Sequence, residues 1–199
     1  MCDNIFYMSQ TEAFINYSTL VVQVTLGLFI FSVISIYLSS RWGAPWVITN
    51  SQIIHRMLDL GELKQGDRIV DLGAGDGRIL VIAARDYGAE GFGVEIDPIR
   101  VLLANFFIWR NRVHKKVKVQ WGNLFDTELQ NIDVITIYLT RETNELLRPY
   151  LEGHCQPGAM IVSYAFPIPG WSPVIIDDRN LIFVYEIGKT GDDVIVQFV

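Results

Sequence analysis

Apolar residues follow two different patterns along the chain, and the change lies near residue 43. Residues 13–40 contain no charged side chain and are apolar over most of their length. From residue 50 onward, short apolar runs alternate with stretches that carry an apolar residue every three or four positions. The first pattern is typical of one long apolar helix, and the second of strands that alternate with helices. We therefore expect an N-terminal segment, residues 1–43, and a separate domain, residues 44–199.

The N-terminal apolar stretch predicts a transmembrane helix over about residues 17–40, because about 20 apolar residues cross the hydrocarbon layer. A cleaved signal peptide would begin with basic residues, but Asp3 and Glu12 are the only charges before the stretch. A buried helix would be apolar on one side, and a helix lying on a membrane would need a charged face. Arg41 follows directly, so the positive-inside rule predicts a single-pass membrane protein with its C-terminal domain on the cytoplasmic side.

The second pattern predicts a doubly wound, mostly parallel seven-stranded sheet with helices packed on it. Helices are expected after Asn50 or Ser51, from about Arg78, after Asp97-Pro98 and over about 142–151. The expected strands are residues 68–72, 91–96, 117–121, 133–139, 159–165, 174–176 and 181–186, with 194–198 as a further edge strand.

The acidic balance and the two cysteines restrict the possible partners. The net charge is −6, so we expect no basic surface for a nucleic acid. Cys2 and Cys155 lie far apart, and the histidines His55, His114 and His154 have no metal-ligand spacing. We therefore expect neither a disulfide framework nor a bound metal.

A glycine-rich turn follows the first predicted strand. Asp71 lies in that strand, and the sequence continues with Gly73-Ala74-Gly75-Asp76-Gly77. Ligands of such sheets bind at the carboxyl ends of the strands, and glycines let the backbone turn tightly and approach a ligand. Glu95 ends the second predicted strand about 20 residues later, where a carboxylate can bind both ribose hydroxyls of a nucleoside.

The spacing of the glycines distinguishes two classes of nucleotide-binding enzyme. Dinucleotide-binding dehydrogenases have G-x-G-x-x-G, whereas here the third glycine, Gly77, comes one position early and Arg78 occupies the place of the last one. This G-x-G-x-G pattern after Asp71 resembles that of the Rossmann-like class I methyltransferases, which use S-adenosylmethionine. The resemblance implies that S-adenosylmethionine is bound by Asp71, Gly73, Ala74, Gly75, Asp76, Gly77, Glu95 and Ile96.

Three residues after later strands complete the predicted cofactor site. Asn123 and Leu124 follow the third strand, where class I methyltransferases hold the adenine, and a plain surface loop is the alternative. Tyr138 ends the fourth strand and would face the methyl donor and shape the acceptor channel. Its alternative role is that of a half-buried aromatic residue in the sheet.

Four stretches resemble a family of protein-lysine methyltransferases. Residues 70–79 resemble the motif of enzymes related to the mitochondrial methyltransferase of ATP synthase subunit c, and of the broad-specificity archaeal enzymes. Residues 44–49, 109–114 and 166–173 resemble further segments of the same family. Ile48 replaces a proline of the family, and residues 138–140 differ from the mitochondrial members, so the identity of the protein substrate does not carry over.

The resemblance implies methyl transfer to a lysine ε-amine of a protein. A membrane protein is one of the substrates that this interpretation allows. Trp46, Tyr138, Phe166 and Trp171 would form a narrow aromatic channel for the lysine stem. Trp46 has two further interpretations, as an aromatic residue at the membrane interface or as part of the domain core. A methyltransferase for a membrane lipid or quinone, and a non-catalytic scaffold that kept the fold, are the alternative functions.

Overall fold

The structure, a computed structural model, describes residues 16–30, 33, 47–189 and 197–198. The chain divides into two compact units, Met1–Arg41 and Trp42–Val199. Each unit is described by itself.

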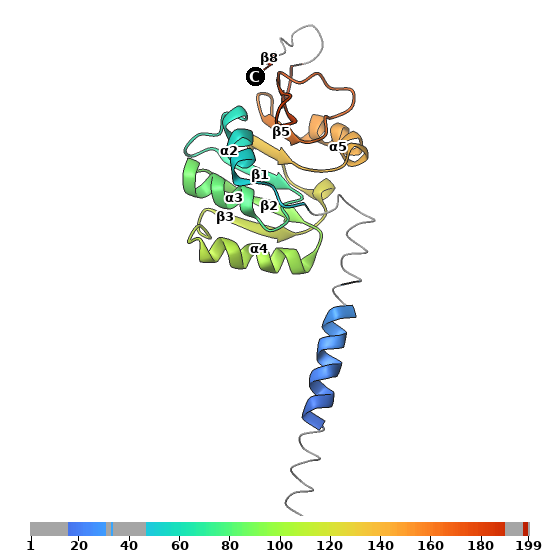
Figure 1. Cartoon of the computed structure of the whole chain (residues 1–199). Helices are drawn as coiled ribbons and strands as arrows, with labels where there is room; N and C mark the ends of the chain where they lie inside the picture. Colours follow the sequence, from blue (N-terminus) through green and yellow to red (C-terminus); the bar gives the residue numbers. More distant parts are fainter. Residues whose placement is uncertain (1–15, 31–32, 34–46, 190–196, 199) are drawn as a thin grey trace, which may run out of the picture. The chain divides into compact units, whose positions relative to one another are not determined.

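The first unit contains a helix over residues 16–30, drawn in blue in Figure 1. Residue 33 is helical as well. In the part of the chain that the structure describes, no helix is long and apolar enough to span a membrane. The predicted single-pass localisation, with a cytoplasmic domain, is therefore wrong. The rest of the predicted span, residues 31–32 and 34–40, and Arg41 lie outside the described residues.

The second unit is built on one sheet with the strand order β3-β2-β1-β4-β5-β7-β6-β8. The first five strands of this order are parallel, and β7 runs antiparallel to both β5 and β6. The seven predicted strands are all present, and the two-residue β8 pairs with β6 as an eighth. Their bounds are β1 Arg68–Leu72, β2 Glu90–Glu95, β3 Val117–Trp121, β4 Val134–Ile137, β5 Met160–Tyr164, β6 Ile175–Asp177, β7 Ile182–Glu186 and β8 Gln197–Phe198.

Helices pack on both faces of the sheet because its strands are apolar on both sides (Figure 1). One core cluster joins one strand face to helices α2, α3 and α4, and the other joins the opposite face to α5. Neighbouring residues of β1 alternate between the clusters: Ile69 belongs to the first and Val70 to the second. The bounds are α2 Ser51–Leu60, α3 Arg78–Ile82 followed by a π-helical turn Ala83–Tyr87, α4 Pro98–Arg110 and α5 Arg141–His154.

Polar residues begin three of these helices, as expected for N-caps. The side chain of Asn50 accepts a hydrogen bond from the backbone N–H of Gln52, and Asp97 accepts one from Ile99. Thr140 caps α5 in the same way. The starts of α2, α4 and α5 are thereby set by local signals that can be recognised in the sequence.

The strand order reverses between β1 and β4, which lie side by side at the centre of the sheet. From β1 the chain proceeds outward through β2 to the edge strand β3, and from β4 it proceeds outward through β5. Ligands of open α/β sheets bind at the carboxyl ends of the strands beside such a reversal. The glycine turn after β1 lies at this point.

Candidate functional site

The turn between β1 and α3 owes its shape to three glycines. Gly73, Gly75 and Gly77 have φ angles of +86°, +55° and +75°, a region that residues with a side chain rarely adopt. A Cβ atom on Gly77 would also lie 3.3 Å from side-chain atoms of Ala104 and Ile108, both on α4. The turn is tied to the neighbouring strand because the N–H groups of Gly73 and Ala74 both donate to the carbonyl of Val94.

Glu95, at the end of β2, points its carboxylate at this turn. One oxygen accepts a hydrogen bond from the N–H of Gly75 at 2.9 Å, and the other accepts one from Asp97 at 3.0 Å. The Arg100 guanidinium lies 3.8 Å from the second oxygen, and Glu95 is only 5% exposed. These contacts hold the carboxylate in place. Because each of its oxygens has further lone pairs, it can still accept hydrogen bonds from two hydroxyls.

Asp71 lies behind the turn, inside the sheet. It is buried and accepts a hydrogen bond of 2.8 Å from the Thr136 hydroxyl on β4. Burial is the main cause that raises the pKa of Asp71 to about 7, and the charges of Glu95 and Asp76 act in the same direction. The hydrogen bond from Thr136 opposes this shift. Asp71 therefore supports the floor of the predicted site and titrates near neutral pH.

Asp76 binds Arg78 rather than lying free at the turn. The Arg78 guanidinium donates two hydrogen bonds from Nε, at 2.9 and 3.1 Å, and one from Nη2 to the Asp76 carboxylate. Its Nη1 donates to the carbonyl of Thr49 at 2.9 Å. Arg78 thus fastens the segment before α2 to the glycine turn. The sequence analysis placed Arg78 at the start of a helix and as a departure from the dehydrogenase motif, and no spacing pattern indicated its contacts with Asp76 and Thr49.

The residues predicted to hold the adenine lie where β3 leads into a short 3₁₀ turn, η2 Leu124–Asp126. Asn123 is exposed, and its side-chain oxygen accepts the N–H of Phe125. Leu124 packs against the core cluster that joins the sheet to α5. Nearby, the ring N–H of Trp121 donates a hydrogen bond to the carbonyl of Ile96. Gly122 donates to the carbonyl of Glu95 at 3.1 Å, so this loop and the end of β2 are joined directly.

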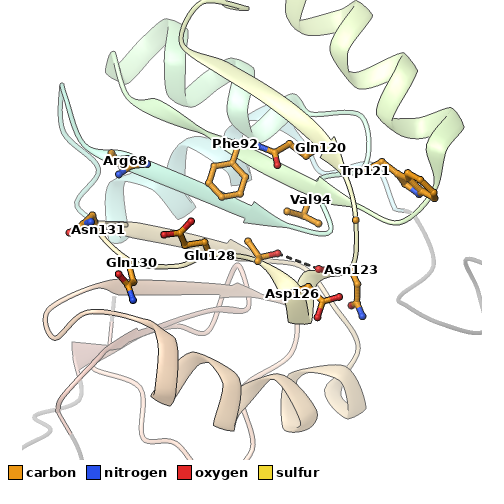
Figure 2. A pocket seen from close by; sticks show the side chains of 12 residues that line it. Arg68, Phe92, Val94, Gln120, Trp121, Asn123, Asp126, Glu128, Gln130 and Asn131 are labelled. Atoms are coloured by element: carbon orange, nitrogen blue, oxygen red, sulfur yellow. Dashed lines mark hydrogen bonds between the residues drawn. The ribbon is translucent and has the colours of Figure 1, made fainter.

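A cavity of about 550 Å³ extends from this loop along the sheet (Figure 2). Phe92 and Val94 on β2 and Gln120 on β3 form its floor, and the segment from Gly122 to Asn131 forms its wall. The dashed line in Figure 2 is the hydrogen bond from the Thr127 hydroxyl to the carbonyl of Asn123. The connection between β3 and β4, which the structure describes in full, contains no helix besides η2. The cavity meets the predicted site at Gly122 and Asn123 and does not include the glycine turn.

Two tyrosines form an aromatic pair at the carboxyl ends of β4 and β5. The ring centroids of Tyr138 and Tyr164 lie 4.6 Å apart, with the planes at 60°. Burial raises the pKa of Tyr138, so its hydroxyl stays protonated. Leu139 follows and lies 3.0 Å from the position of a Cβ on Gly73, which places this strand end beside the glycine turn. Sequence analysis named Tyr138 but missed Tyr164, although both residues directly end buried strands.

The loop after β5 holds two further predicted residues in different surroundings. Phe166 is 41% exposed, and its carbonyl accepts hydrogen bonds from Ser163 and from the buried amide of Asn144. Trp171 packs on Tyr185, with centroids 5.7 Å apart, and donates to Glu152 near the end of α5. Tyr185 pairs with Ile161 near the start of β5, so these contacts hold Trp171 away from the strand ends where Tyr138 lies. Trp46 lies outside the described residues.

Comparison with known proteins gives relatives over most of the second unit. The family model described as ANTKMT methyltransferase domain matches residues 71–175. A protein-lysine N-methyltransferase of Saccharolobus islandicus (strain REY15A) is 36% identical over 152 residues, which cover 73% of this chain and 94% of that protein. The adenine nucleotide translocase lysine N-methyltransferase of Mus musculus is 30% identical over 77% of this chain and 68% of its own length.

A solved structure agrees with the fold. The RNA methyltransferase from Salinibacter ruber in complex with S-adenosyl-L-homocysteine superposes with a TM-score of 0.70 at 34% identity. The match covers 75% of this chain and 99% of that one. The class I methyltransferase fold, the S-adenosylmethionine cofactor and the resemblance to protein-lysine methyltransferases are thereby confirmed. The chain belongs to the family of the ANTKMT methyltransferase domain and is an S-adenosylmethionine-dependent methyltransferase.

Proposed function

We propose that residues 44–199 form a domain that transfers a methyl group from S-adenosylmethionine to a lysine ε-amine of a protein. The observation that carries the proposal is the Tyr138–Tyr164 pair, which lies at the strand ends beside the glycine turn. Aromatic rings pack against the apolar stem of a lysine side chain and exclude water from their surroundings. The names of the relatives from Saccharolobus islandicus and Mus musculus support the same substrate class.

The residues at the turn fit the cofactor. The positive φ angles of the three glycines leave the backbone open to a ligand, and the buried Glu95 carboxylate offers acceptors for a ribose. We assign the binding of S-adenosylmethionine to Gly73–Gly77, Glu95 and Ile96, to Asn123 and Leu124 at the adenine, and to Tyr138, with Asp71 and Asp76 supporting the turn. When bound, the cofactor supplies a methyl group that its sulfonium makes electrophilic.

The chain's own residues must deliver a neutral lysine amine to that methyl group. A pocket with aromatic walls disfavours the charged ammonium form, because burial without a partner lowers the pKa of an amine. Holding the amine at near-attack distance supplies much of the remaining catalysis. Tyr138 and Tyr164 form these walls, and Phe166 extends them on the exposed side. Trp171 does not line the pocket in this proposal; its contacts with Tyr185 and Glu152 position the loop after β5 that carries Phe166. This arrangement requires no dedicated general base.

The acidic balance of the chain favours a protein over a nucleic acid as the substrate. A net charge of −6 favours a basic, lysine-bearing partner, and the basic residues 110–117 lie between the end of α4 and the start of β3, at the end of the sheet opposite the glycine turn. The RNA methyltransferase from Salinibacter ruber is the match whose name points to the other substrate class. The experiment that tests the proposal therefore has to separate these classes.

The test is transfer of labelled methyl from S-adenosylmethionine to an extract of the source cells, which is then separated into protein, RNA and lipid. We expect label in protein, recovered as methyl-lysine after acid hydrolysis. The Gly75→Arg variant should transfer none, because its side chain fills the turn, and circular dichroism checks that it is folded. Label in RNA or lipid would overturn the substrate assignment but retain the enzyme class. Equal transfer by both proteins would refute the proposed cofactor site.

A further inference from the structure

We propose that the outer face of α4, together with the basic segment that follows it, binds the surface of an anionic lipid bilayer. The contact is made by the folded methyltransferase unit itself and needs no segment that spans the membrane. It is independent of the substrate assigned above. Three observations support it: exposed apolar residues on α4, a concentration of positive charge beside them, and tryptophans toward both ends of the helix.

The outer face of α4 is apolar, although it faces solvent. Its inner stripe, Val101, Ala104, Asn105 and Ile108, packs on the sheet and is buried or half-buried. The outer stripe would be polar in an ordinary surface helix. Here it consists of large apolar side chains with the exposed fractions Leu102 72%, Leu103 57%, Phe106 59%, Phe107 40% and Trp109 61%.

Positive charge is concentrated directly after these residues. Residues 98–125 contain no Asp or Glu and carry six Lys and Arg side chains, in a chain with a net charge of −6. Five of the six lie within residues 110–118, at the end of α4 and the start of the edge strand β3: Arg110, Arg112, Lys115, Lys116 and Lys118. Among the described residues, no carboxylate forms an ion pair with any of these five.

Tryptophans mark both ends of the apolar face. Trp109 lies in the last turn of α4 and stacks with Phe106, with ring centroids 6.1 Å apart. Trp121 is 71% exposed, and its ring nitrogen donates to the carbonyl of Ile96, two residues before α4 begins. Tryptophan prefers the boundary between lipid headgroups and acyl chains, where its ring is apolar and its N–H can find an acceptor.

The charge decides between a lipid surface and the other possible occupants. A second copy of the chain, bound about a two-fold axis, would bring two basic segments together, and like charges repel. A nucleic acid would neutralise the basic residues but would leave the Leu and Phe side chains without an apolar partner. An anionic bilayer matches both features, because apolar side chains enter the acyl region while lysines and arginines contact the headgroups.

The test is flotation of the full chain with vesicles of phosphatidylcholine, with and without phosphatidylglycerol. Phe106→Ser combined with Trp109→Ser should weaken binding to the anionic vesicles about tenfold or more. Arg112→Glu combined with Lys115→Glu, two exposed residues directly after α4, should weaken it to a similar extent and abolish its dependence on salt. Leu146→Ser is the control, because Leu146 is 67% exposed on α5, on the other face of the sheet.

Every protein in the series retains the N-terminal helix, so differences between them report on α4 alone. Unchanged affinity for S-adenosylmethionine shows that each variant is folded. The proposal is refuted if the α4 variants bind vesicles as the unaltered chain does. It is also refuted if they instead abolish a dimer in sedimentation, or reduce binding to RNA while vesicle binding stays the same.

Discussion

At the scale of single residues, Glu95 connects most of the candidate site. Its carboxylate links β2 to the glycine turn through Gly75 and to the start of α4 through Asp97. The position of a carboxylate at the end of the second strand could be predicted from the sequence, because it follows from strand length and motif spacing. The N–H groups of Gly75 and Asp97 that bind this carboxylate could not be predicted, because they depend on how the turn folds back toward β2.

Replacement of Glu95 by Gln should weaken S-adenosylmethionine binding about tenfold to a hundredfold. The amide keeps one acceptor but loses the charge, and hydrogen bonds to a charged group contribute about 1.5–3 kcal/mol. Isothermal titration calorimetry measures the affinity, and Glu62→Gln, a change to an exposed carboxylate outside the site, is the control. An affinity equal to that of the unaltered chain would remove Glu95 from the cofactor site.

Asp71 should make the stability of the protein depend on pH below neutrality. Its pKa is about 7 when folded and 3.8 as the reference value, so folding takes up a proton between these pH values. The contribution of the protonated Asp71 carboxyl to the stability of the fold is fully present below about pH 4 and is lost as the pH rises through about 7. In the Asp71→Asn variant this loss is absent, so its stability relative to the unaltered chain should rise over that range, by on the order of a few kcal/mol.

Urea unfolding at a series of pH values measures this difference. The exposed residue Asp178 provides the control, as Asp178→Asn should leave the pH profile unchanged. A difference between the Asp71→Asn protein and the unaltered chain that stays constant with pH would show that folding does not shift the pKa of the Asp71 carboxyl.

At the scale of helices and strands, elements with a strong local signal were predictable and the connections were not. The β-branched run of β4 and the Asp97-Pro98 start of α4 gave the elements to within a few residues. The N-terminal stretch differs, because apolar composition alone predicted a membrane span, and among the described residues no helix is long and apolar enough for one. Trp171 differs for another reason: its loop folds back on α5 and β7, and no sequence pattern reports the direction of such a fold.

Removal of the α4 cap should destabilise the protein by about 1 kcal/mol. The Asp97 side chain accepts hydrogen bonds from Ile99 and Arg100, which Asp97→Ala removes and Asp97→Asn retains in large part. Thermal unfolding of both variants checks this expectation. Equal midpoints for Asp97→Ala and Asp97→Asn would show that the cap itself contributes little.

At the scale of the whole molecule, charge and apolar surface are unevenly distributed. Positive charge is concentrated in residues 98–125, while the chain as a whole is acidic. The glycine turn, Glu95 and the tyrosine pair occupy the carboxyl ends of the strands, and α4 begins three residues after Glu95. The lipid contact proposed for α4 and the methyl-transfer chemistry therefore use neighbouring parts of one unit and can be tested by separate variants.

The cavity along β2 and β3 gives ligands of the proposed cofactor site room to extend beyond the predicted adenine residues. A nucleoside analogue placed at Asn123 can carry a substituent from its adenine edge into that space of about 550 Å³. Arg68 and Glu128 in the lining offer charges of opposite sign, so an amide or zwitterionic substituent suits both. S-adenosylmethionine is a cofactor common to many enzymes, whereas the cavity is lined by side chains particular to this chain, among them Arg68 and Glu128. Compounds that occupy both regions should therefore discriminate between methyltransferases of one fold.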